Sequence, residues 1–109
     1  MRVGIIRCQQ TEDLCPGTKD LVCASHGMAA FKELGPCEVM GIVSCGGCPG
    51  KRAVARALML KSKGAEAIAL ASCMKKGVPL NFPCPNYEQI LKAIKEKLGP
   101  DFVVLESTH

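Results

Sequence analysis

Cysteine is the residue type in this sequence that points most clearly to chemistry. The chain of 109 residues contains eight cysteines, namely Cys8, Cys15, Cys23, Cys37, Cys45, Cys48, Cys73 and Cys84. A thiolate can bind a soft metal ion, attack a disulfide or be oxidised. In a chain that is typical of a reducing compartment, such a density of thiols favours metal binding or redox chemistry over structural disulfides.

Two of these cysteines form a C-x-x-C motif, Cys45-Gly46-Gly47-Cys48, directly before a predicted helix. The two glycines allow a tight turn, and Pro49 suits the first turn of the helix that follows. The positive end of that helix favours negatively charged sulfur nearby. The motif is therefore equally suited to bind a metal or to act as a redox dithiol through Cys45 and Cys48.

The apolar segments predict the fold that must position the cysteines. Strands are expected at residues 3–7, 38–44, 67–71 and 102–105. Short apolar strands that alternate with helices are typical of a parallel sheet covered on both faces. We therefore predict an α/β fold, namely a small doubly wound, flavodoxin-like, three-layer domain with a four-stranded parallel sheet in the order 2-1-3-4.

Three stripes at helical spacing predict the helices between these strands. The first stripe consists of Leu21, Ala24, Met28 and Phe31. The helix that it predicts is expected to end at Gly35-Pro36. The second helix, over residues 52–63 and ended by Gly64, is expected to bury Val54, Ala57 and Leu58. The third, capped by Asn86, carries Tyr87, Ile90, Leu91, Ile94 and Leu98.

The predicted sheet brings distant cysteines to one edge. Cys8 follows the first strand, Cys45 and Cys48 follow the second, and Cys73 follows the third. Parallel strands all end at the same edge, and neighbouring strands lie about 4.8 Å apart. We therefore expect Cys8, Cys45, Cys48 and Cys73 to be the nearest set of ligands in one metal centre.

Other residues are expected around that edge. Cys15, Cys23 and Cys84 lie in predicted loops after the first and third strands, and His109 follows the fourth strand. Residues 75–85 are expected to lie over the centre and exclude water. Cys37 begins a strand and is expected at the opposite edge, while His26 is expected at the surface or as a helix cap.

The motifs resemble those of the CGGC-domain family, small prokaryotic proteins named after this tetrapeptide. The resemblance spans the chain through GIIRC (4–8), CPG (15–17), CGGCPG (45–50), ASC (71–73), CP (84–85) and STH (107–109), with Ser107 in place of the usual glycine. It implies a single metal-binding domain over residues 1–109. The ligands that it implies are Cys8, Cys15, Cys23, Cys45, Cys48, Cys73, Cys84 and His109.

Three classes of function remain open for this chain. The first is a metal-binding protein, with zinc as the first choice of metal and an iron–sulfur cluster as the second, because thiolates suit both. The second is a thiol–disulfide oxidoreductase that uses the dithiol of Cys45 and Cys48. The third is an interaction module in which a metal ion only stabilises the fold.

The composition argues against several kinds of partner. The net charge is +4, and the chain has one tyrosine, three phenylalanines and no tryptophan, so we expect no nucleic-acid binding. No apolar run approaches the roughly eighteen residues that a membrane-spanning helix needs. The start of the chain does not resemble a signal peptide. We therefore expect a cytoplasmic protein that does not interact with membranes.

Overall fold

The computed structural model describes residues 1–9, 15–47, 50–77 and 84–109. Its sheet consists of β1 (Arg2–Arg7), β2 (Glu38–Ser44), β3 (Ala67–Leu70) and β4 (Val103–Leu105). The strands run in the order β2-β1-β3-β4, and every neighbouring pair is parallel. The predicted topology is therefore confirmed.

Burial explains why β3 is apolar throughout and why β1 has no polar side chain between its terminal arginines. All four residues of β3 are buried, and Val3, Ile5 and Ile6 of β1 are completely inaccessible to solvent. Strands covered on both faces cannot alternate between apolar and polar side chains. The outer strand β2 is less buried, and its pairing with β1 shifts register at Met40, where a bulge adds one residue to β2.

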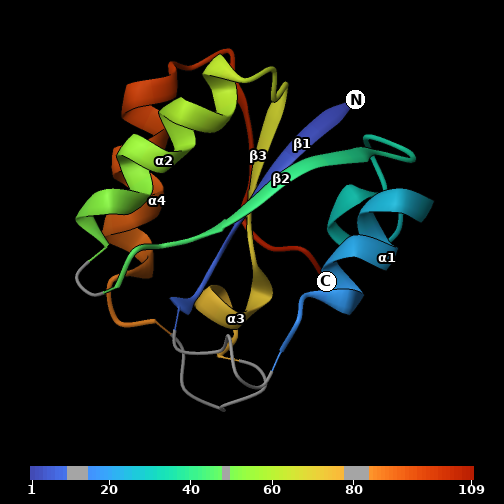
Figure 1. Cartoon of the computed structure of the whole chain (residues 1–109), viewed down its shortest axis with the longest axis horizontal. Coiled ribbons are helices and arrows are strands. Elements are labelled where there is room, and N and C mark those ends of the chain that lie inside the picture. The colour runs from blue at the N-terminus through green and yellow to red at the C-terminus, as the bar shows by residue number, and fades with distance from the viewer. Residues whose placement is uncertain (10–14, 48–49, 78–83) are drawn as a thin grey trace.

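The helices form a layer on each face of the sheet (Figure 1). Figure 1 shows α2 (Lys51–Ser62) and α4 (Tyr87–Leu98) on one face and α1 (Thr18–His26) on the other. The chain moves from β1 to the neighbouring β2 through α1, and then crosses back over β1 to β3 and β4. The winding therefore reverses beside β1, as expected for a doubly wound three-layer fold.

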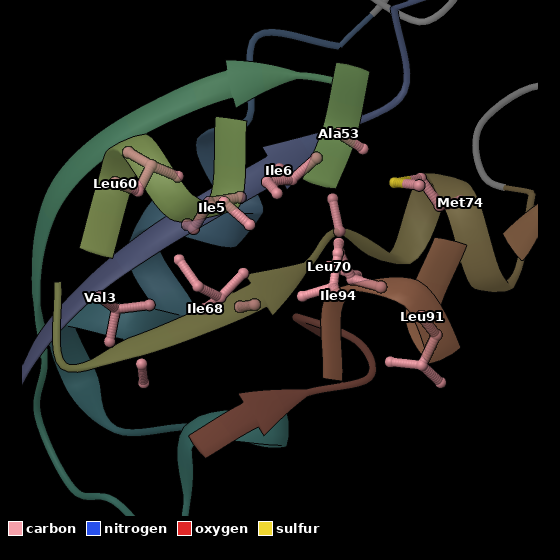
Figure 2. Close-up of a cluster of buried hydrophobic side chains, with 14 of the residues drawn as sticks. Val3, Ile5, Ile6, Ala53, Leu60, Ile68, Leu70, Met74, Leu91 and Ile94 are labelled. Carbon is pink, nitrogen blue, oxygen red and sulfur yellow. The ribbon is translucent and has the colours of Figure 1, made fainter. Parts of the chain in front are cut away.

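A cluster of buried apolar side chains joins the sheet to these helices (Figure 2). It includes Ile68 and Leu70 from β3, Leu60 from α2 and Ile94 from α4. Ile68, Leu70 and Ile94 are completely buried. Full burial of one such side chain contributes about 1.5–3 kcal/mol to the free energy of unfolding, so this cluster fixes the helices against the strands.

Two of the helix predictions were wrong in detail. The first helix ends at His26 because Gly27, with φ 64°, adopts the left-handed conformation and its N–H bonds to the carbonyl of Ala24. Met28 is consequently exposed, and Phe31 belongs to a separate short helix, η2 (Ala29–Phe31). On α2 the buried residues are Ala53, Ala57 and Leu60, whereas the predicted Leu58 is exposed.

The last helix agrees with its pattern. All five residues of its predicted stripe are buried. Asn86 occupies the N-cap position of α4, although its side chain makes no capping hydrogen bond with the residues that the structure describes. A short helix that was not predicted, α3 (Ser72–Lys75), directly follows β3 and carries Cys73.

Candidate metal centre at the carboxyl edge of the sheet

Three cysteines follow the ends of three neighbouring strands. Cys8 follows β1, Cys45 follows β2, and Cys73 is the second residue of α3, just beyond β3. The backbone N–H of Cys45 donates to the carbonyl of Arg7 at 2.7 Å, so the chain stays paired with β1 at this point. The N–H of Ala71 likewise donates to the carbonyl of Ile6 at 2.8 Å.

One hydrogen bond joins two of these cysteines directly. The backbone N–H of Cys8 donates to Sγ of Cys73 at 3.3 Å. Cys73 is only 8% exposed, and Cys8 is half-buried. An N–H donor aimed at a sulfur stabilises negative charge on it, and such donors are typical of the surroundings of metal-bound thiolates. The contact therefore favours Cys73 as a thiolate.

Two further cysteines are attached to the same edge through their backbones. The guanidinium group of Arg7, the last residue of β1, donates to the carbonyl of Cys15. The N–H of Cys84 donates to the carbonyl of Met74 at 2.9 Å, which brings Cys84 alongside α3. Both cysteines are half-buried. The chain thus returns to the strand ends at both positions.

The C-x-x-C loop turns as its glycines predict. Gly46 and Gly47 have φ angles of 83° and 93°, in the region that favours glycine. Arg56 of α2 fixes the start of this loop, because its Nη1 donates to the carbonyl of Ser44 at 3.0 Å and to Oγ of Ser44 at 2.8 Å. The second cysteine of the motif, Cys48, lies outside the described residues.

A buried polar network that was not predicted lies beside Cys73. It consists of Asp20, Ser72 and Thr108, which are 5%, 0% and 0% exposed. The N–H of Ser72 donates to Oγ1 of Thr108 at 3.1 Å, and the N–H of Thr108 donates to Oγ of Ser72 at 3.2 Å. Oγ1 of Thr108 also donates to Oδ1 of Asp20. Ser72 lies within the ASC motif and Thr108 within the STH motif, and these two motifs were the sequence feature that could have pointed to the network.

His109 is joined to this network. Its N–H donates to Oγ of Ser72 at 2.9 Å, and its Nε2 lies 3.5 Å from Oδ1 of Asp20. Burial lowers the pKa of His109 below its usual value of 6.5, and Asp20 opposes this shift only in part. A lowered pKa favours the neutral imidazole, which is the form that binds metals.

The remaining sulfur atoms belong to other parts of the fold. Cys23 was expected in a loop, but it lies within α1 and is 5% exposed. Cys37 precedes β2 at the opposite edge, as predicted, and its Sγ donates to the carbonyl of Gly35 at 3.2 Å. His26 is exposed at the end of α1, in agreement with its predicted place.

The chemistry of the donors fits a soft metal ion, because thiolates are the preferred ligands of zinc and iron–sulfur clusters. Among residues 1–9, 15–47, 50–77 and 84–109, however, no three cysteine, histidine or acidic side chains come close enough to hold a metal ion. Cys48 and residues 78–83, the middle of the predicted cover, are not among them. The described side chains therefore do not form a complete metal site by themselves.

Two surface hollows are lined by α4, and the smaller of them also by the start of α2. The larger, of about 500 Å³, lies along α4 between Glu88 and Pro100, and the smaller, of about 210 Å³, lies between Lys51 and Gln89. Among the residues that the structure describes, no cysteine lines either hollow. Within the described part of the chain, no helix is long and apolar enough to cross a membrane.

Comparison with known proteins gives two matches. The family model described as the CGGC domain matches residues 2–109. The uncharacterized protein MJ0582 of Methanocaldococcus jannaschii is 34% identical over 117 aligned positions, which cover all of this chain and 87% of that protein. No solved structure matches the chain.

Proposed function

The chain belongs to the CGGC-domain family, and from that premise we propose that it binds a metal ion through cysteine thiolates at the carboxyl edge of its sheet. The observation that carries this proposal is the bond from the N–H of Cys8 to Sγ of Cys73, made where β1 and β3 end side by side. Cys45 follows β2, the neighbour of β1 on its other side, at the same edge of the sheet. Membership in the family supports metal binding in general.

We propose Cys8, Cys45, Cys48 and Cys73 as the nearest ligands. Cys15, Cys84 and His109 are proposed as further ligands, since their backbones bond to residues at the ends of β1 and β3 or next to Cys73. Cys23 remains a weaker proposal because it lies within α1. More than four ligands leave room for a second metal ion or for a separate redox pair.

Zinc is the first choice for this centre. Four thiolates in a tetrahedral arrangement suit zinc, and a closed zinc site contributes directly to the free energy of folding. We also propose that the protein works in a reducing compartment such as the cytoplasm, where thiols remain available as ligands. An iron–sulfur cluster is the second choice, because it uses the same ligands.

Elemental analysis and a visible spectrum of anaerobically purified protein test the proposal. We expect colourless protein that retains zinc in a fixed ratio to the chain. Brown protein that contains iron and sulfide would instead show that the bound group is an iron–sulfur cluster. Protein that retains no metal, takes up none and cycles two thiols per turnover would contradict the proposal and favour a dithiol oxidoreductase.

A further inference from the structure

Asp20 is an acidic side chain in a place where acidic side chains are rare. It lies in the first turn of α1 and is 5% exposed. Carboxylates are almost never fully buried unless they are paired. Two groups from the C-terminal segment contact it: Oγ1 of Thr108 donates to its Oδ1, and Nε2 of His109 lies 3.5 Å from the same oxygen. Figure 1 shows this end of the chain beside α1.

The main chain of His109 is fixed as well. Its N–H donates to Oγ of Ser72 at 2.9 Å, and Oγ of Ser72 donates to its carbonyl at 2.8 Å. Ser72 is completely buried and directly precedes Cys73. The imidazole is therefore restrained from two directions, by Ser72 at its backbone and by Asp20 at Nε2.

A carboxylate beside one ring nitrogen decides which nitrogen carries the proton. Asp20 favours the tautomer with hydrogen on Nε2, because a carboxylate accepts hydrogen bonds and repels a nitrogen lone pair. Nδ1 then keeps its lone pair. Histidines that bind metals commonly give their other N–H to a carboxylate in this way, which orients the ring and strengthens the ligand.

We propose that Asp20 is a positioning residue of the centre, which holds His109 in the Nε2–H tautomer and leaves Nδ1 as the nitrogen that binds the metal. The inference rests on the proposed function, since it concerns the same centre. Thr108 supports Asp20 by donating its hydroxyl to the same carboxylate oxygen.

The tautomer can be measured in metal-free protein. The chain has two histidines, so His26→Gln leaves His109 as the one imidazole for nitrogen NMR. We expect the Nε2–H form to dominate at neutral pH, and we expect Asp20→Asn to shift the population toward an even mixture. A dominant Nδ1–H form in the protein with Asp20 intact would overturn the proposal.

The consequence for metal binding is tested by the affinity for zinc, which is measured by competition with a chromophoric chelator. Asp20→Asn should weaken binding by about 10- to 100-fold, the usual effect of losing such a partner. In a His109→Ala background, Asp20→Asn should add almost nothing, because Asp20 acts through the ring. Asp101→Asn, at an exposed position, is the matched control. Circular dichroism should give the same helix content for all variants.

The two proposals fail in different ways. Equal losses of affinity with and without His109 would mean that Asp20 is merely structural, which would overturn the positioning role and leave the metal centre intact. Unchanged zinc affinity in Asp20→Asn would also overturn the positioning role and leave the metal centre intact. Wild-type protein that binds no zinc would overturn the proposed function itself and, with it, the role of Asp20 toward that metal.

Discussion

At the scale of residues, the chain contains its own control for the thiols at the strand ends. Cys45 and Cys37 are 6% and 5% exposed, so they are matched in burial, but they lie at opposite edges of the sheet. A substitution at either position removes a buried sulfur of similar size. The difference between the two variants therefore isolates metal binding from packing.

We predict that Cys45→Ser lowers the zinc retained after dialysis by at least tenfold, because one ligand is lost. Cys8→Ser and Cys73→Ser should behave in the same way. Cys37→Ser should retain zinc at the wild-type ratio, even if its free energy of unfolding falls by about 1 kcal/mol. Equal zinc loss from Cys37→Ser and Cys45→Ser would contradict the proposed ligand set.

Tyr87 gives a prediction about pH. Its hydroxyl donates to the carbonyl of Glu106 at 2.5 Å, and its pKa is raised from 10.0 to about 12, first by burial and then by the charges of Glu106 and Glu88. Because the pKa in the folded state is the higher one, the neutral phenol stabilises the fold fully below pH 10.0, and this contribution is lost as the pH rises toward 12.

The chain has a single tyrosine, so the tyrosinate absorbance band reports on Tyr87 alone. We expect its midpoint to lie near pH 12 in folded protein. We also expect Tyr87→Phe to lower the free energy of unfolding by about 1 kcal/mol at neutral pH, because one hydrogen bond is lost. A midpoint near the ordinary value of free tyrosine would refute the buried, hydrogen-bonded phenol.

At the scale of elements, Gly50 controls how closely α2 packs against α4. Gly50 is the N-cap of α2, with φ 89°, and a Cβ built there would lie 2.3 Å from Cδ1 of the buried Ile90. Gly17, the N-cap of α1, has nearly the same left-handed backbone, with φ 82° and ψ 16° against 89° and 20° at Gly50, but the nearest described atom to a Cβ there would be Oδ2 of Asp20, at an ordinary contact distance of 3.6 Å. The two positions therefore separate backbone strain from a packing clash.

We predict that Gly50→Ala lowers the free energy of unfolding by roughly 1–3 kcal/mol more than Gly17→Ala does, because it adds overpacking against Ile90. Both variants share the cost of alanine in the left-handed region, about 1–2 kcal/mol. Urea denaturation monitored by circular dichroism measures the difference. Equal losses would mean that α2 and α4 are not in close contact at this position.

Strands were easier to predict than helices, for physical reasons. The central strands are buried on both faces, so continuous apolar runs such as residues 67–71 mark them without ambiguity. A helix buries one face, and in α2 apolar residues occupy both faces, which hid the role of Leu60. The end of α1 depends on the left-handed conformation of Gly27 rather than on the later Gly35-Pro36.

At the scale of the whole molecule, the winding of the sheet gathers residues that are far apart in the sequence. Cys8 and Cys73 are 65 positions apart, yet the N–H of one bonds to the sulfur of the other. This juxtaposition was predictable because parallel strands all end at one edge. The link between Asp20 and Thr108, across 88 positions, was not, since no repeating pattern marks a single buried hydrogen bond.

The most direct measurement is a crystal structure of the zinc-loaded protein, with the metal located by anomalous scattering. Our account predicts a zinc ion about 2.3 Å from sulfur, bound by Sγ of Cys8, Cys45 and Cys73 beyond the ends of β1, β2 and β3. Zinc bound elsewhere, or these three sulfur atoms without a shared metal, would contradict it.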